Sequence, residues 1–580
     1  MGWPPWVLED VIARRPAIRV NQLGYLPGQP LQATLVSERS DAVDFAVIDE
    51  DGTVVSTGRS QPWPIRPEPS SALTVHTLES AGIAAPGSCL RLTSAGFGSH
   101  PFRVAEDIYA GLFADSLRVF RLMRSGIPVT ADVLPGYSRP AGHVNTPPNS
   151  GDAAVAAWTG PEAEKLYPGW HCEGTFDVSG GWYDAGDYGK YMTSGSIACW
   201  QLLGILDFLP PSTAPDSIVT AVREECRWQL DWMLRMQVPA REPLPGMAFH
   251  RIHGTAWSPL PGLPHDDPTL RVLHRPSTAA TFHLAAVAAH GARQFREADP
   301  TFADRLMAAA TRAYDAAIAH PNLLAPDDHA LFGGGPYPDE DPSDDHYWAS
   351  AELWIATHEA RYLEQLAGSA WHNTDVFDLD GFDFDRVAAP GRLDLALHGF
   401  PLPGLANVRD SVIAAADRLL TVAAGQPWGQ PYAPDAGWGW GSNGRLLNNL
   451  VVIAVASLLT DEERYRAAVA AGMSYLLGRN PLGQSYITGY GTDDTRHQRT
   501  RQFGHDLDDS LPPSPPGALA GGPNSQPHPD FPYDDRLRGL PAQCCYVDEP
   551  TSEVTNDICI RWNAPLTYIA AFLTYRARRR

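Results

Sequence analysis

Two aspartates, Asp184 and Asp187, lie in the segment of the chain that is most informative about its chemistry. They stand three residues apart around an Ala-Gly pair, with aromatic residues on both sides. Two carboxylates can act as acid and base, and the C–H faces of a sugar stack on flat rings. The pattern therefore indicates acid–base chemistry on a carbohydrate, whereas the two aspartates alone could also cap a turn. The flanking aromatic residues are Trp182, Tyr183, Tyr188 and Tyr191.

The overall charge limits the partners. The 580 residues carry a formal net charge of −23 at pH 7. Because a strongly acidic protein repels polyanions, we predict no nucleic-acid partner and a neutral or cationic substrate. No segment approaches the roughly 20 consecutive apolar residues of a membrane span, so we also predict no membrane partner.

The seven cysteines include the neighbours Cys544 and Cys545 but form no CxxC pair. An odd number without metal-type spacing favours reduced thiols in a reducing compartment. The first residues, MGWPPWVLEDVIARRP, lack the basic and then apolar regions of a signal peptide. We therefore expect a cytoplasmic protein, or a secreted one if a leader was removed.

Residues 18–105 are predicted to form an all-β domain. Short runs of β-branched and aromatic residues recur between Gly and Pro, and the Asp51-Gly52 pair between two such runs predicts a hairpin. A β-sandwich of immunoglobulin type satisfies this pattern.

Residues 106–580 are predicted to form a mainly α domain. Apolar residues recur three and four apart, and long Pro-rich loops such as 505–542 separate the helical segments. Ten to twelve helices with long loops suggest an (α/α)6 barrel. The predicted helices are 107–125, 193–208, 216–236, 277–294, 301–319, 344–365, 406–424, 443–459, 461–477 and 564–578.

A series of motifs extends the first one along nearly the whole chain. In order, they are the segments 176–191, 229–237, 275–280, 347–353, 438–443, 475–486, 521–524 and 562–566. In order and rough spacing these motifs closely resemble glycoside hydrolase family 9, the cellulase family. Residues 18–27 likewise resemble the start of the immunoglobulin-like module that precedes many of its catalytic domains.

The resemblance implies an inverting hydrolysis, in which the acid and the base stand ~6.5–9.5 Å apart around a water molecule. It implies that Asp187 is the base and that Asp184 shares or orients the water. Asp557 stands where the family usually has its acid, a Glu. Since Asp is one methylene shorter, Glu553 is the alternative acid, and the loss of any acid is a third alternative.

Six further residues are predicted to bind the substrate: Tyr183, His250, Trp348, Trp438, His497 and Arg501. Arg501 could hydrogen-bond sugar hydroxyls, and the tryptophans could stack on sugar rings. The alternatives are a surface Arg, a loop His and core tryptophans. The histidine pair that the family often places before Arg501 is absent, and His497 only partly replaces it.

The resemblance requires no cofactor. Some members bind zinc, but here the first position corresponds to Ser125 and the Cys-His pair reads His171-Cys172, so no metal site is carried over. The acidic runs 338–345 and 506–509 could bind a structural calcium ion, although neither has EF-hand spacing and solvated loops are the simpler interpretation.

The sequence therefore predicts an inverting hydrolase of β-1,4-linked glucan or glucosamine-type chains. Its partner would be a β-linked oligo- or polysaccharide, and exo action on short oligosaccharides is a variant of this prediction. The alternative from a different class is a non-catalytic carbohydrate-binding protein that has kept the Asp187 loop and lost its acid.

Overall fold

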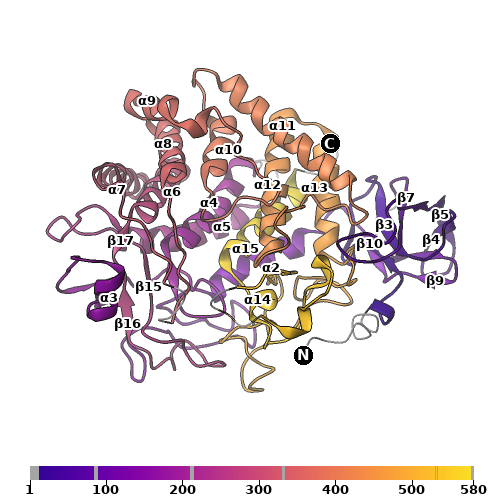
Figure 1. Ribbon diagram of the computed structural model, residues 1–580, viewed down its shortest axis with the longest axis horizontal. Helices are drawn as coiled ribbons and strands as arrows, with labels where there is room; N and C mark the ends of the chain where they lie inside the picture. Colours follow the sequence, from indigo (N-terminus) through magenta and orange to yellow (C-terminus); the bar gives the residue numbers. More distant parts are fainter. Residues whose placement is uncertain are drawn as a thin grey trace.

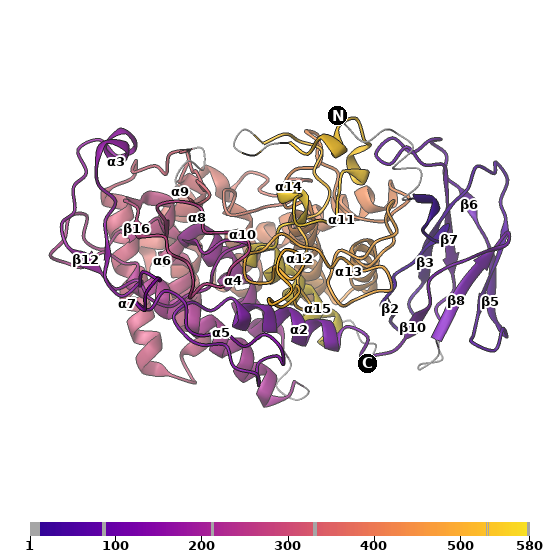
Figure 2. The ribbon, with the colours of Figure 1, turned by 90° about the horizontal axis from the view of Figure 1, so that it is seen from below.

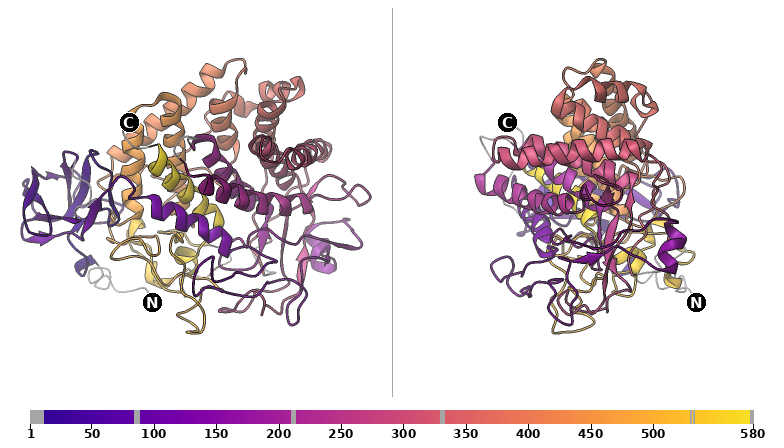
Figure 3. Two further views of the ribbon diagram at one scale, coloured as in Figure 1. Left: turned by 180° about the vertical axis from the view of Figure 1, so that it is seen from behind. Right: turned by 90° about the vertical axis from the view of Figure 1, so that its left-hand side faces the viewer.

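The computed structural model describes residues 12–83, 89–209, 214–328, 333–528, 531 and 533–576. An all-β part comes first in the chain and lies at one end of the long axis of the molecule (Figure 1). The helical part makes up the rest, with its long loops gathered on one side of the helices (Figure 3).

The all-β part is a sandwich of two sheets. One sheet has the strand order β1-β3-β7-β6, and the other has β2-β10-β8-β4-β5 with β9 beside β8. The predicted hairpin at Asp51-Gly52 is confirmed, because β4 and β5 pair antiparallel around it. The strands are β1 Ile18–Arg19, β2 Gly24–Tyr25, β3 Leu31–Val36, β4 Asp44–Ile48, β5 Val54–Arg59, β6 Gln61–Pro62, β7 Val75–Ser80, β8 Cys89–Ser94, β9 Phe97–Gly98 and β10 Phe102–Val104.

Within the described residues, six long helices that are buried on most or all sides form an inner ring. Each contacts the next, and the last contacts the first, so that the ring closes. Their residues are apolar or small around much of the helix circumference, which suits a helix enclosed on every side. They are α4 Met192–Phe208, α6 Thr278–Phe295, α8 Ser343–Thr357, α10 Ala388–His398, α12 Ser442–Thr460 and α15 Ile560–Tyr575.

The outer helices each bury one face against this ring and expose the other, as their amphipathic sequences require. Each outer helix precedes an inner helix along the chain, so the fold is the predicted (α/α)6 barrel after an immunoglobulin-like sandwich. The outer helices are α2 Ala110–Leu122, α5 Asp216–Arg235, α7 Pro300–Ala319, α9 Ala360–Gly368, α11 Leu405–Ala424 and α13 Glu463–Leu476.

Short elements decorate the end of the barrel where the long loops gather. Strand β13 pairs with β15, which pairs with β16, and β14 pairs with β17. The short elements are α3 Pro161–Leu166, α14 Glu553–Asn556, β11 Val155–Ala156, β12 Thr175–Phe176, β13 Lys190–Tyr191, β14 Ala248–Phe249, β15 Arg251–Gly254, β16 Arg271–Leu273 and β17 Pro276–Ser277, with three 3-10 turns, Ala370–His372, Asp535–Leu537 and Ala542–Cys544.

The structure corrects three helix predictions. The segment 344–365 is two helices, because His358 adopts a left-handed conformation with φ of 56° and ends α8. Helix α10 was not predicted, since Pro390 and Gly391 in its first turn read as helix breakers, although Pro is tolerated there. The final helix begins at Ile560, and the last two residues of the predicted segment 564–578 lie outside the described residues.

Because the last helix begins at Ile560, Asn563 lies inside it and does not cap it. Its side chain accepts a hydrogen bond from the N–H of Leu519 and donates one to the carbonyl of Gly517. The residue ties a loop to the helix instead of starting the helix.

Helix α12 is more apolar than the sequence analysis expected of any segment, because it has the length and composition of a possible membrane span. An 18-residue stretch of this 19-residue helix has a mean hydropathy of 1.3. In the structure 78% of that stretch is buried, and the helix packs against α11, α13 and α15. Its apolar character is thus explained by its place in the inner ring.

The sandwich docks on the outer side of the barrel beside α13 (Figure 2). The Asn21 side chain donates to the hydroxyls of Tyr109 and Ser474, and the N–H of Gln22 donates to the carbonyl of Leu477. The seven cysteines, all described, are free thiols.

Candidate active site

A cavity of about 220 Å³ lies where the inner helices begin. It is lined by segments that lead into α4, α8, α10, α12 and α15. The positive ends of these helix dipoles therefore point toward it, which favours negative charge there. Four carboxyl groups line the cavity: Asp184, Asp187, Glu553 and Asp557. A larger depression of about 820 Å³ on the sandwich is wide open, and Asp44, its one acid, pairs with Arg59.

Asp187 lies at the cavity wall, five residues before α4. One of its carboxylate oxygens accepts a hydrogen bond of 2.9 Å from the N–H of Gly189, and the side chain is half-buried. The hydrogen bond fixes one oxygen, while the carboxylate as a whole stays on the cavity surface. This is the position that a base needs in order to take a proton from water.

Asp184 is almost fully buried, with 1% of its surface exposed. Ser194 and Tyr337 each donate a hydroxyl hydrogen bond to its carboxylate. Burial raises the pKa of Asp184 to about 6, although these two hydrogen bonds act in the opposite direction. Its backbone carbonyl also accepts from the N–H of Ile560. Asp184 thus joins the Asp187 loop to the start of α15.

Asp557 comes three residues before α15 and faces the same cavity. Its Oδ1 accepts hydrogen bonds from the N–H groups of Gly186, at 3.1 Å, and Ile558, at 2.9 Å. Burial, followed by the nearby charges of Glu553 and Asp187, raises the pKa of Asp557 well above its ordinary value. A carboxyl group that keeps its proton at neutral pH has the property that a general acid requires.

Glu553, the alternative acid, lies in α14 on the same cavity wall. Burial raises its pKa, but the guanidinium of Arg499 lies 3.3 Å away and lowers it. A neighbouring cation favours the ionised form of a carboxyl group. Between the two, Asp557 has the surroundings that better suit a proton donor.

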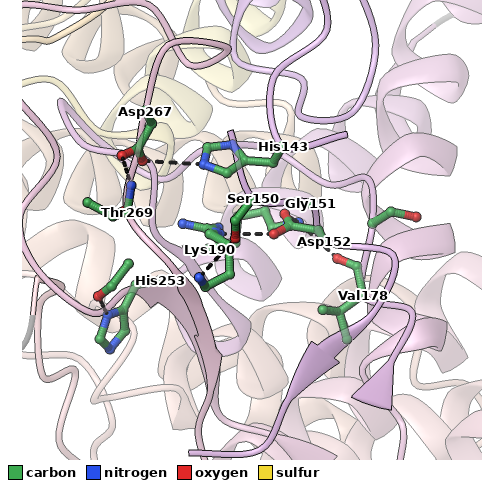
Figure 4. A network of polar contacts seen from close by, with 12 residues as sticks. His143, Ser150, Gly151, Asp152, Val178, Lys190, His253, Asp267 and Thr269 are labelled. Carbon is green, nitrogen blue, oxygen red and sulfur yellow. Dashed lines mark hydrogen bonds and ion pairs between the residues drawn. The ribbon is translucent and has the colours of Figure 1, made fainter. Parts of the chain in front are cut away.

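A buried ionic network anchors the Asp187 loop from behind (Figure 4). Lys190 donates to the carbonyls of Val178 and Gly180 and lies 2.7 Å from Asp152. Arg271 holds the other oxygen of Asp152 at 2.9 Å. Burial alone would raise the pKa of Asp152, but the two cations lower it below its ordinary value. The network fixes both ends of the turn that carries the two aspartates.

Aromatic side chains form much of the remaining wall. Trp440 packs edge-on against Phe531 with ring centroids 5.0 Å apart, and Trp257 lies near the same ring. Such surfaces are suited to stacking on sugar rings. The aromatic lining residues are Tyr191, Trp257, Tyr337, Phe384, Trp440, His528, Phe531 and Trp562.

Comparison with known proteins identifies the chain. The sequence model described as "Glycosyl hydrolase family 9" matches residues 109–570, and the one described as "Cellulase N-terminal ig-like domain" matches residues 13–99. The chain belongs to glycosyl hydrolase family 9. The resemblance seen in the motifs is therefore confirmed.

Relatives in this family span the chain almost completely. Endoglucanase C of Cellulomonas fimi is 45% identical over 96% of this chain, which spans about half (52%) of that protein's length. A cellulose 1,4-beta-cellobiosidase of Acetivibrio thermocellus is 33% identical, covering 97% of this chain and 68% of the relative.

Solved family 9 structures share the fold. A metagenome-derived family 9 endoglucanase has a TM-score of 0.82 and 27% identity, covering 96% of this chain and 99% of that chain. AaCel9A in complex with cellobiose-like isofagomine has a TM-score of 0.81 and 25% identity, with the same coverage.

Five of the substrate-binding residues that the family resemblance suggested do not line the cavity. Tyr183 is fully buried and its hydroxyl lies 2.7 Å from His143 Nδ1. Trp348 is fully buried in the ring, edge-on to His283. Trp438 packs against Tyr432 in the core. All three side chains have core positions, which for Trp348 and Trp438 was the alternative interpretation.

The two histidines also lie away from the cavity surface. His250 is buried behind the wall, 3.0 Å from the hydroxyl of Ser277, and burial lowers its pKa to about 3. His497 is exposed on 48% of its side chain and pairs with Asp506. His497 is therefore not the replacement for the missing histidine pair that the sequence suggested.

Arg501 does line the cavity, but two of its donor groups hold backbone. Its Nε donates to the carbonyl of Ser258 and one terminal nitrogen donates to that of Gly186. The guanidinium also lies over the ring of Trp257 at 5.6 Å. Arg501 thus helps to place the loop between Asp184 and Asp187.

Most of the aromatic wall was missed from the sequence. Trp440 is an exception, because the Gly-Trp-Gly-Trp-Gly run before α12 offers it, like Trp438, as a possible stacking platform, and it does line the cavity. Trp257, Tyr337 and Phe531 stand in irregular loops, where no periodicity indicates which way a side chain points. The positions that correspond to zinc ligands in some family members do not form a cluster among the described residues. His171 is exposed, and Cys172 contacts Glu242.

Proposed function

We propose that this chain hydrolyses β-1,4-linked glucan or its oligosaccharides with inversion at the anomeric carbon. One observation carries the proposal: the Asp187 loop and the Asp557 segment meet in one aromatic-lined cavity, where burial raises the pKa of Asp557 well above its ordinary value. A base that is ionised and an acid that is protonated are the two groups that inverting hydrolysis needs.

In the proposed reaction Asp187 removes a proton from water, and the oxygen of that water attacks the anomeric carbon. Asp557 gives its proton to the glycosidic oxygen as that bond breaks. Asp184, held by Ser194 and Tyr337, orients the water and the loop. Water, an acid and a base suffice for this chemistry, so the reaction requires no cofactor.

The alternative of a non-catalytic binding protein does not fit these observations. Such a protein has no need for a buried carboxyl group with a raised pKa opposite a second carboxyl group, and the relatives at 45% and 33% identity are named as enzymes. They include an endoglucanase and a cellobiosidase, so the experiment must also distinguish endo from exo action.

Incubation with β-1,4-linked gluco- and glucosamine oligosaccharides, followed by product identification, tests the proposal. We expect glucan cleavage, with the α-anomer appearing first in early NMR spectra. A β-anomer appearing first would show retention and a different set of catalytic groups. Absence of any cleavage across the panel would remove the proposal.

We also propose a structural calcium ion at Asp339, Asp344 and Asp345, within the acidic run 338–345. Asp345 is fully buried, and neither of its oxygens has a well-directed hydrogen bond, although His283 lies 2.7 Å away. Burial, joined for Asp339 by the charge of Asp345, raises the pKa of both Asp339 and Asp345 to about 8. Carboxylate oxygens are the donors that calcium prefers. The second run, 506–509, is exposed and lacks this feature.

A further inference from the structure

A second buried cluster of polar groups lies at the opposite end of the inner ring. It combines Asp207 from the last turn of α4, His290 from α6, Glu352 from α8 and Asp394 from α10. The side chains of His290 and Glu352 are fully buried, and that of Asp394 is 4% exposed. The mechanism uses none of these groups.

The cluster has unpartnered polar atoms that point into it. Both ring nitrogens of His290 and Oε1 of Glu352 are buried without a hydrogen bond. His290 Nδ1 lies 3.6 Å from an Asp394 oxygen and 3.8 Å from Glu352 Oε1. A protonated imidazole bonded to a carboxylate would lie closer, at about 2.7–2.9 Å.

Distances of this length suit donor atoms that share one ion. Two ligands that each bind a tetrahedral ion at about 2.0–2.2 Å stand roughly 3.3–3.6 Å from one another. His290 Nδ1, one oxygen of Glu352 and one of Asp394 all lie within 4.8 Å of one another. A small inward movement of these side chains would complete the set.

The surrounding groups support the same interpretation. Asp207 lies 3.5 Å from the other ring nitrogen of His290, which is the arrangement that orients metal-binding histidines. Arg293 binds the other oxygen of Glu352 at 2.7 Å and leaves Oε1 to face the cluster. The tryptophan Trp200 donates to Asp394 at 2.8 Å.

Charge balance points the same way. Three carboxylates, Asp207, Glu352 and Asp394, face the guanidinium of Arg293 and the imidazole of His398, which lies 3.3 Å from Asp207. With the carboxylates ionised, two negative charges are uncompensated if His398 is neutral and one if it is protonated. Buried charge without a partner is costly, and the negative ends of the inner helix dipoles lie on this side. A divalent cation would neutralise the cluster.

We propose that His290, Glu352 and Asp394 bind one transition-metal ion of the zinc type at the closed end of the barrel, with Asp207 orienting His290. The nitrogen donor and the small number of ligands favour zinc over calcium. The ion would tie α6, α8 and α10 together and stabilise the ring. This proposal is independent of the proposed hydrolysis.

Metal analysis of the whole protein tests it, with expression in medium supplemented with zinc. We expect about one zinc per chain, and a lower melting temperature after the protein is unfolded in a chelator and refolded without metal. Zinc returned during refolding restores the melting temperature. In H290Q the zinc content should fall below about 0.1 per chain, whereas H346Q, a histidine on α8 outside the cluster, retains it.

D207N provides a test if H290Q does not fold. Loss of a group that orients a metal-binding histidine lowers affinity by about 10–100-fold, which a competing chelator would measure. The proposal is overturned if the wild-type protein holds no zinc and gains no stability from it. It is equally overturned if a folded H290Q keeps its zinc, or if the affinity of D207N is unchanged.

Discussion

The N–H of Gly186 donates a hydrogen bond to Oδ1 of Asp557 across 371 positions of sequence. Through this hydrogen bond the backbone between Asp184 and Asp187 contacts the proposed acid directly. A Cβ added at Gly186 would lie 2.6 Å from Asp557 Oδ1 and 2.5 Å from the carbonyl of Arg499. The short Asp side chain is thus accompanied by a close approach of the two segments.

The substitution G186A should therefore increase the distance between Asp187, the proposed base, and Asp557, the proposed acid. Misplacement on the scale of 1 Å can lower a rate by about 10²-fold, and we expect kcat to fall by that order while the protein stays folded. G368A is the matched control, because a Cβ there meets no atom within 4 Å. Steady-state kinetics on one oligosaccharide measures both. Unchanged kcat in G186A would mean that the contact has no role in the reaction.

Loss of the base is tested by D187N. General-base catalysis typically contributes about 10²–10⁴-fold, so kcat should fall by at least about 10² with little change in substrate affinity. D177N, an exposed carboxylate in the same segment, should behave like the wild type. Near-normal turnover in a folded D187N would show that another group is the base.

The identity of the acid is tested by pairing D557N with E553Q. D557N should nearly abolish cleavage of substrates with poor leaving groups and spare activated aryl glycosides, which need little protonation. E553Q should retain most of its activity on both. The opposite result would assign the role to Glu553.

The pH profile gives an independent test of Asp557. A general acid works only while protonated, and the pKa of Asp557 is raised by burial. We expect kcat/KM to fall as the pH rises through that pKa, and the residual rate of D557N to lack this alkaline decline. An alkaline limb that persists in D557N would belong to another group.

Calcium removal should make stability depend on pH in a defined direction. Asp339 and Asp345 bind protons more tightly in the folded chain, with pKa values raised to about 8. Without calcium, their contribution to stability is full below the ordinary Asp pKa of about 4 and falls as the pH rises to about 8. Melting temperatures with and without EGTA measure this. We expect calcium to raise the melting temperature more at pH 8 than at pH 5. An equal increase at both pH values, or no increase, would exclude the site.

Disruption of the buried ionic network of Lys190, Asp152 and Arg271 behind the Asp187 loop should lower both the stability of the protein and its reaction rate. K190M leaves Asp152 with one cation and removes the donors to Val178 and Gly180. Breaking a buried ion pair typically costs about 3–5 kcal/mol. K165M, which removes an exposed lysine from a surface pair, should change the free energy of unfolding little. Chemical denaturation of both variants provides the comparison.

The sequence alone was enough to predict the type of fold and to single out the aspartates that meet in the cavity. Local periodicity indicates which segments are helices. The run from Phe176 to Tyr191 can be recognised without the structure, because its residues are contiguous in the sequence. For the same reason nine of the ten predicted helices agree with the structure to within a few residues at the ends where it describes them. The exception is 344–365, where a single left-handed residue, His358, divides the helix.

Only the tertiary structure decided which aromatic residues face the cavity and which polar groups meet. Trp438 and Trp440 are two residues apart, yet the first packs in the core and the second lines the cavity. His290, Glu352 and Asp394 are 62 and 42 positions apart along the chain, so no spacing rule could join them. Closure of the helix ring brings such groups together, because it is determined by packing between segments distant in sequence.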